Sequence, residues 1–275
     1  MLFNIRPNPM ISAPTISFQK AGSQSAGNML YATVGDQWEA AFLESGTIRF
    51  NGAPGDVDIF LVANGHSGNN PTAPLDDGIG KKLYRAGEGG DGGNWLLLRT
   101  SLLKAGVDYV LTIGTNTTLV GGSINLTTAN GNAGSSGGTR GLIYMTNVGI
   151  SGRSPSGNIT QHAGKGADGV FAYNDAYDRI IVSQFKSKRF CAGGGGGDAF
   201  YYGGGVYETA DNSGGATGGG HGSWYRTPSN IGDASAGGAN SGAGGGGGRV
   251  CYEGFDTLGA AGGSGVAFVR KHLEA

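Results

Sequence analysis

Two cysteines have the most reactive side chains in this chain of 275 residues. Cys191 precedes the glycine run Gly193–Gly197, and Cys251 follows the run Gly244–Gly248. Two cysteines do not make a disulfide framework, and in a cytosolic product both are thiols by default. If the two glycine runs are neighbours, however, the cysteines could lie close enough to form a disulfide. The sequence leaves both arrangements open.

Other side chains with catalytic or metal-binding chemistry lack the spacing that such chemistry needs. The four histidines show no metal-ligand spacing, and the neighbouring carboxylates Asp76 and Asp77 are typical of a solvated loop. No glycine run continues into the Lys-Ser or Lys-Thr of a phosphate-binding loop, and no GxSxG motif occurs. We therefore expect no enzyme, no cofactor and no metal site. The histidines are His66, His162, His221 and His272.

Large aromatic residues between the glycine runs are the best candidates for binding a partner. Tyrosine, tryptophan and arginine dominate interface energies, and surrounding glycine and serine supply turns and adaptable hydrogen bonds. The alternative is that these aromatic residues only cover the flanks of a glycine-rich core. The candidates are Phe200, Tyr201, Tyr202, Tyr207, Trp224, Tyr225 and Arg226, with Tyr173 and Tyr177 as further ones.

Glycine accounts for 58 residues and dominates the C-terminal third of the chain. A flexible linker is one interpretation of such a composition. The other is a lattice of polyglycine-II helices, in which every backbone N–H and C=O points outward and bonds to a neighbouring segment. Only glycine allows backbones to approach so closely. The runs that suit this role are Gly193–Gly197, Gly203–Gly205, Gly218–Gly220 and Gly244–Gly248.

The elements that would position these residues divide the chain into three predicted parts. Residues 1–45 are predicted to be an N-terminal attachment segment, with one or two helical turns in Ala32–Glu44 and with Trp38 and Phe42 packed against the next part. Residues 46–190 are predicted to be a β-rich scaffold with glycine-rich excursions, and residues 191–275 a polyglycine-II lattice with a closing strand.

Within the scaffold, alternating or apolar runs predict strands at Val57–Val62 and Arg179–Ser183. Gly89–Gly93 is interpreted as a turn. The basic residues Lys186, Lys188 and Arg189 are interpreted as a solvated surface.

Charge and hydropathy exclude several classes of partner. The formal net charge is −1, so nothing predicts binding to nucleic acid. No apolar stretch is long enough for membrane insertion. The N-terminus lacks the order of a signal peptide, so we expect synthesis in the cytoplasm without a secretion signal.

Four segments carry a resemblance to a known family: VDIFLVANG, GGDGGNW, LLKAGVDYVLTIG and the closing FVR. The pattern of Leu103, Ala105, Gly106, Tyr109 and Gly114 fits best. The chain resembles the glycine-rich domain of bacterial and phage proteins, which also occurs outside the cell in the anaplastic lymphoma kinase receptor. The resemblance implies a mainly β fold with little α-helix, in which a β-sandwich-like scaffold carries a packed bundle of polyglycine-II helices.

The same resemblance implies a function. Phage tail-fibre tip adhesins use a similar scaffold, with variable loops at the end of the lattice. The expected function is a receptor-binding protein at the tail tip of a virion, which binds a bacterial outer-surface protein or glycan through loops and other tail proteins through residues 1–45. The alternative is a non-binding structural or assembly protein of a virion tail or of a bacterial cell surface.

Overall fold

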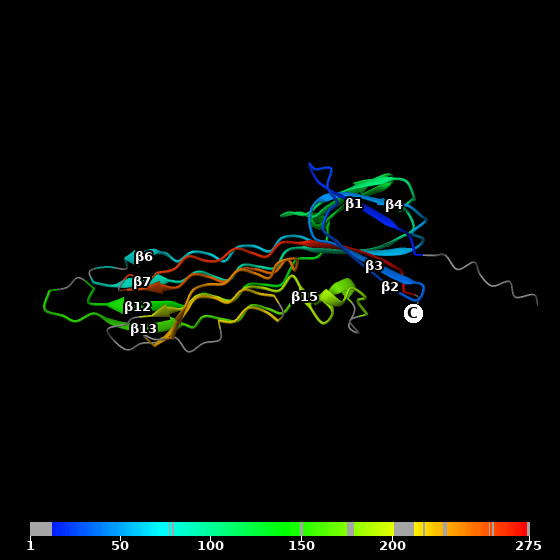
Figure 1. Ribbon diagram of the computed structural model, residues 1–275. Helices are drawn as coiled ribbons and strands as arrows, with labels where there is room; N and C mark the ends of the chain where they lie inside the picture. Colours follow the sequence, from blue (N-terminus) through cyan, green and yellow to red (C-terminus); the bar gives the residue numbers. More distant parts are fainter. Residues whose placement is uncertain are drawn as a thin grey trace, which may run out of the picture.

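The computed structural model describes residues 13–76, 78, 80–148, 151–174, 179–200, 212–216, 218–227, 230–252, 254 and 256–273. These residues form an elongated molecule with a β-sandwich at one end and a bundle of long, side-by-side segments extending from it (Figure 1). We call the sandwich end the base and the opposite end the distal end. The predicted mainly β fold is confirmed, because the helical elements among the described residues are short 3-10 turns: η1 (Thr128–Asn130), η2 (Ala172–Asn174) and η3 (Ser183–Phe185).

The sandwich consists of two five-stranded antiparallel sheets. The first sheet has the order β1 (Ile16–Lys20), β4 (Gly46–Phe50), β9 (Asp108–Thr112), β10 (Thr118–Gly121) and β11 (Ile124–Thr127). The second sheet has the order β2 (Met29–Val34), β3 (Gln37–Phe42), β20 (Val266–Lys271), β5 (Val57–Val62) and β8 (Trp95–Thr100).

The central strands of the second sheet are buried on both faces, which explains why β5 is apolar at every position except Asp58. The face of β20 that carries Ala267 and Val269 packs against the first sheet. The opposite face, with Val266 and Phe268, packs against the segment that contains η2 and η3. The alternation expected for the closing strand is therefore confirmed.

The prediction of a separate N-terminal segment is wrong for the residues that the structure describes. No helical turn forms in Ala32–Glu44, because β2 and β3 pair as a hairpin there. Strand β3 lies inside the second sheet between β2 and β20, and Trp38 and Phe42 are buried in the main core. Since β1 also pairs with β4, this part of the chain belongs to both sheets, and we expect it to be needed for folding.

Arg179–Ser183 was predicted to be a strand, and this prediction is also wrong. Ile180 and Val182 do face the second sheet, as the apolar pattern indicated. The backbone N–H groups of Ile181 and Val182, however, donate to the buried carboxylate of Glu39, at 3.1 and 3.4 Å. A side chain on β3 therefore takes the place of a neighbouring strand.

The described glycine-rich segments form the predicted lattice, whereas the predicted run Gly203–Gly205 lies outside the described residues. Along Gly193–Gly197, contacts repeat every three residues: Gly194 and Gly197 face Gly245 and Gly248, whereas Gly193 and Gly196 face Ser136 and Thr139. The N–H groups follow the same period, since Gly194 and Gly197 donate to the carbonyls of Gly90 and Gly87. A period of three with extended backbone is that of a polyglycine-II helix.

The two longest runs lie at the centre of the lattice. Backbone bonds surround residues 191–198 with segments 86–94, 132–141, 163–169, 212–216, 218–223 and 241–249. Gly89–Gly93, predicted to be a turn, is therefore a lattice segment. The predicted boundary at residue 191 does not separate scaffold from lattice, because segments before it contribute to the same bundle. Each of these segments passes next to backbone atoms, which is why glycine recurs in segments far apart in the sequence.

Short strands form at both ends of the lattice. Near the base, β14 (Val170–Phe171) pairs with β15 (Arg189–Phe190). At the distal end lies a four-stranded sheet (Figure 1). Its order is β13 (Ser156–Gln161), β12 (Leu142–Thr146), β7 (Lys82–Arg85) and β6 (Thr72–Asp76). Its strands β7 and β12 contribute Tyr84 and Ile143 to a small core that also includes Val250. Two further pairs are β16 (Ala199–Phe200) with β19 (Val250–Cys251), and β17 (Trp224–Thr227) with β18 (Asn230–Gly232).

Candidate functional site

The distal end is the candidate site because several hairpin turns that connect lattice segments lie there. The β6–β7, β12–β13 and β17–β18 hairpins carry these turns. Phe200 and Asn212, the described residues on either side of residues 201–211, also lie at this end. The ends of the chain that the structure describes, Ala13 and Leu273, lie at the base instead (Figure 1).

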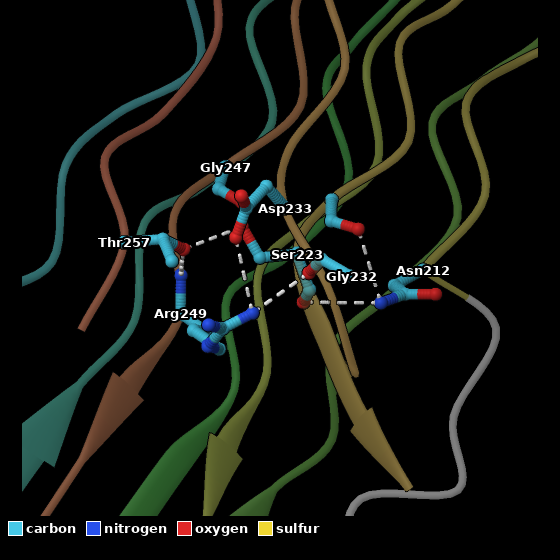
Figure 2. Close-up of polar contacts among 8 residues, drawn as sticks. Asn212, Ser223, Gly232, Asp233, Gly247, Arg249 and Thr257 are labelled. Carbon is cyan, nitrogen blue, oxygen red and sulfur yellow. Dashed lines mark hydrogen bonds and ion pairs between the residues drawn. The ribbon is translucent and has the colours of Figure 1, made fainter. Parts of the chain in front are cut away.

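Arg249 anchors the β17–β18 hairpin to the lattice. It follows the run Gly244–Gly248, and its side chain is only 8% exposed. Its Nη1 donates to the carbonyl of Gly232 at 2.9 Å and lies 3.4 Å from a carboxylate oxygen of Asp233 (Figure 2). Since Gly232 ends β18 and Asp233 follows it, a side chain from the lattice core holds one end of the hairpin.

A chain of hydroxyl groups holds the other end. Ser223 precedes β17, is fully buried and donates to the carbonyl of Gly247 at 3.3 Å. The Thr257 hydroxyl donates to Ser223 Oγ at 2.8 Å and accepts the backbone N–H of Arg249 at 3.2 Å (Figure 2). The hairpin is therefore fixed at both ends to the same lattice segment.

Asn212 extends this network to the neighbouring segments. Its Nδ2 donates to the carbonyls of Gly222 and Ser223, at 3.3 and 3.2 Å, and lies 3.5 Å from Asp198 Oδ1. Asp198 follows the run Gly193–Gly197 as Arg249 follows the other long run. Both are buried, so the end of each central run carries a charge inside the protein.

The comparisons agree with this architecture. A family model described as a glycine-rich domain matches residues 43–272, which includes both sheets and the whole lattice. The chain belongs to the glycine-rich domain family. Comparison with curated proteins and with solved structures gives no match.

The predicted contact residues of this glycine-rich domain fall into three groups. Trp224 lies on β17 at the distal end, where its ring packs over Gly232 of the paired strand. Tyr225 and Arg226 are also in β17, although their side chains lie outside the part that the structure describes. Four predicted residues are themselves outside the described residues: Tyr177, Tyr201, Tyr202 and Tyr207.

Two of the residues predicted to contact a partner are buried, so the prediction is wrong for them. Phe200 has no exposed surface and packs against Cys251. Tyr173 is 5% exposed and lies against the second sheet near the base, with its ring 5.8 Å from that of Phe60. The guanidinium of Arg270 lies 3.8 Å from the centre of the Tyr173 ring. These two aromatic residues stabilise the ends of the lattice, which is the alternative that the sequence had left open.

The residues that anchor the hairpin were missed in the sequence. A signal for them exists: each long run ends in a charged residue that a short apolar pair follows, Asp198 before Ala199–Phe200 and Arg249 before Val250–Cys251. Among the described residues, no group of His, Cys, Asp and Glu side chains could hold a metal ion. The same residues contain no helix of the length and apolar character that a membrane span requires.

Of the two arrangements that the sequence left open for Cys191 and Cys251, the structure has two free thiols and no disulfide between them. The two central runs are parallel, since Gly244 donates to the carbonyl of Ala192 and Val250 to that of Asp198. Cys191 therefore lies at the base end of the lattice and Cys251 at the distal end, roughly 25 Å apart for a polyglycine-II rise. A disulfide needs Cα atoms within about 7 Å. Only antiparallel runs would have brought the cysteines together.

Both thiols are expected to resist modification in the folded protein. Cys191 is 1% exposed, and burial raises its pKa to about 12; Cys251 is 2% exposed. Because the thiolate is the reactive form, little of Cys191 reacts at pH 8. A thiol-specific reagent should label neither cysteine in the native chain and both after unfolding, as measured by mass spectrometry. Rapid labelling of native Cys191 would contradict the buried position.

Arg249→Met is expected to destabilise the protein by about 1.5–3 kcal/mol, because it removes the hydrogen bond from a buried guanidinium to the backbone carbonyl of Gly232. The matched control is Asp233→Asn on the same ion pair. The Asp233 side chain is 79% exposed, so its change should cost less than about 1 kcal/mol. Denaturant unfolding measures the free energy of unfolding of both variants. Hydrogen exchange should show faster opening of β17 and β18 only in the Arg249 variant. Equal costs would mean that Arg249 does not anchor the hairpin.

Proposed function

We propose that this glycine-rich domain is a receptor-binding adhesin at the tip of a phage tail or tail fibre, which binds a bacterial outer-surface protein or glycan. The observation that carries the proposal is the separation of the two ends. The described chain ends lie at the base, whereas hairpin turns gather at the distal end, on a lattice bonded along its length. Such a molecule can be attached at one end and make contact with the other.

The β17–β18 hairpin supports the proposal most directly. It carries Trp224, Tyr225 and Arg226, which are the residue types that dominate interface energies. Its anchoring through Arg249 and Ser223 reduces the entropy that a partner must overcome when it binds a loop. A rigid scaffold that presents loops is the arrangement on which binding residues commonly occur.

The test is the binding of the labelled, purified chain to a panel of intact bacterial strains. We expect saturable binding to some strains and not to others. Trp224→Ala and Arg226→Ala should each weaken it by about tenfold or more at an unchanged melting temperature. The control is Val110→Ala on β9 of the base, where Val110 is 52% exposed. A chain that binds no strain, or variants that bind as well as the parent, would favour the structural role in a tail or cell surface instead.

A further inference from the structure

Three Asn-Gly pairs occur in the chain, at residues 51–52, 64–65 and 130–131. Asparagine is one of the chemically labile residues of proteins. The backbone nitrogen of the next residue can attack its side-chain amide carbon, and glycine permits this attack best because it has no side chain to obstruct the approach. The three pairs have the same local chemistry, so the folded structure decides which of them reacts.

The Asn64–Gly65 pair belongs to the lattice. The Gly65 N–H donates to the carbonyl of Gly263 at 2.9 Å, and Asn64 Oδ1 accepts the N–H of Gly265 at 2.7 Å. The attacking nitrogen and the amide that it would attack are therefore both held by hydrogen bonds to the segment that precedes β20. Reaction at this pair requires local unfolding of the lattice first.

The Asn130–Gly131 pair is held at the end of η1. The Gly131 N–H donates to the carbonyl of Thr128 at 3.0 Å. A Cβ atom at Gly131 would overlap the carbonyl of Trp95, so the backbone on this side is closely packed as well. Here too the attacking nitrogen is engaged, and it becomes available only when the turn opens.

The Asn51–Gly52 pair differs from both. It lies in the bend between β4 and β5, and Asn51 is exposed. Among the described residues, no acceptor binds the Gly52 N–H. A Cβ atom at Gly52 would lie 3.6 Å from Pro14 Cα, which is an ordinary contact. The attacking nitrogen therefore has no hydrogen bond to break and has room to approach the amide of Asn51.

We propose that Asn51–Gly52 is a site of spontaneous deamidation and that the modification loosens the N-terminal strand β1. A base removes the proton of the Gly52 nitrogen, which forms a bond to Asn51 Cγ. The side-chain nitrogen takes up a proton and leaves as ammonia. Water then opens the cyclic succinimide at either carbonyl. The product is aspartate, or isoaspartate, in which the backbone continues through the former side chain.

Both products change a contact that fixes β1 to β4. Asn51 Nδ2 donates to Ser17 Oγ at 2.9 Å, and neither product has this donor. Isoaspartate also lengthens the backbone by one carbon atom directly after Phe50, which pairs with Ile16. Because β1 is the edge of the first sheet, we expect it to open more often after the change. This modification concerns the base and is independent of what the distal end binds.

The experiment follows deamidation of the full chain at pH 8 by tandem mass spectrometry of its peptides, in the native state and in guanidinium chloride. In the denatured chain the three pairs should react at similar rates. In the native protein Asn51 should react within about tenfold of its denatured rate, whereas Asn64 and Asn130 should each be slowed by more than about tenfold, because opening must precede their reaction.

Gly52→Ala is the matched control. The φ of Gly52 is not positive and a Cβ atom has room, so alanine fits the fold while its methyl group hinders the attack. The variant should keep the circular dichroism of the parent and deamidate at position 51 at least about tenfold more slowly. Hydrogen exchange of β1 should become faster in the parent during incubation and stay unchanged in the variant.

Several results would overturn the proposal. The site is wrong if native Asn51 reacts more than about tenfold more slowly than denatured Asn51, or if native Asn64 or Asn130 reacts as fast as Asn51. This comparison decides the question even where Gly52→Ala does not fold. A folded Gly52→Ala that deamidates as fast as the parent would exclude attack by the Gly52 nitrogen. If β1 exchanges no faster in the deamidated parent than before incubation, the modification does not loosen the strand.

Discussion

Gly195→Val and Gly246→Val are each expected to prevent folding of the chain at ordinary temperature. A Cβ atom at position 195 would overlap the carbonyl group of Asn212, and one at position 246 would overlap that of His221. Both neighbours are backbone in the lattice, so neither can rotate away. We expect a loss of more than about 4 kcal/mol, which is comparable to the whole stability of many domains.

The matched control is Gly114→Ala. Gly114 has a negative φ, and the nearest atom to its Cβ would be the carbonyl oxygen of Asn116 at 3.8 Å, an ordinary contact. This variant should fold and unfold within about 1 kcal/mol of the parent. Soluble yield, circular dichroism and denaturant unfolding compare the three proteins. A lattice variant that folds with parental stability would show that the central runs are not closely packed.

Arg270→Met is expected to have the second largest effect, about 3–5 kcal/mol of destabilisation. Arg270 on β20 lies opposite Glu39 on β3 and Asp58 on β5, and all three residues are buried. Its Nε donates to Asp58 at 3.1 Å. Removing the cation leaves two carboxylates inside the sheet without the charge that lies between them, which is costly in a medium of low dielectric constant.

The adjacent residue provides the control. Lys271 forms a shorter ion pair, 2.6 Å to Asp36, but the Asp36 side chain is 63% exposed. Lys271→Met should therefore cost less than about 1 kcal/mol. Asp58→Asn added to Arg270→Met should recover part of the loss, because one buried charge then disappears. If Lys271→Met costs as much as Arg270→Met, burial does not determine the strength of these pairs.

The sequence predicts the fold well where a local pattern has one physical solution. An apolar run such as Val57–Val62 is stable only between two apolar layers, and the structure places it there. The alternation in the closing strand likewise predicts its two faces. Glycine runs long enough to bond in three directions predict the lattice, because no other residue can occupy such positions.

The errors come from features that depend on contacts distant in sequence. Nothing in Ala32–Glu44 indicates that its partner is β20, more than two hundred residues later. Ile180 and Val182 show a strand pattern, but the Glu39 carboxylate satisfies the backbone that a neighbouring strand would have bonded. The sequence could not decide between free thiols and a disulfide, because equal flanks do not distinguish parallel from antiparallel runs.

The candidate site could be predicted only in part. Aromatic residues between glycine runs indicate which segments lie at the ends of the lattice. Phe200, Tyr173 and Trp224 all stand in glycine-rich sequence, however, so the sequence does not distinguish the buried residues from the partly exposed one. Their burial depends on which end each segment reaches and on what covers it there. Arg249 and Thr257 act through a network that joins distant segments, so neither residue is distinctive by itself.

The extended lattice segments have a mechanical consequence. A polyglycine-II helix already rises about 3.1 Å per residue, close to the limit of about 3.3–3.6 Å for a fully extended chain. Pulling on the distal end can therefore lengthen each segment only slightly. The load also divides among many segments that run side by side and bond to one another along their length. Since the described chain ends lie together at the base, such a pull strains no single path from one end to the other. The molecule should behave as a short, stiff rod that transmits force to its base almost without stretching.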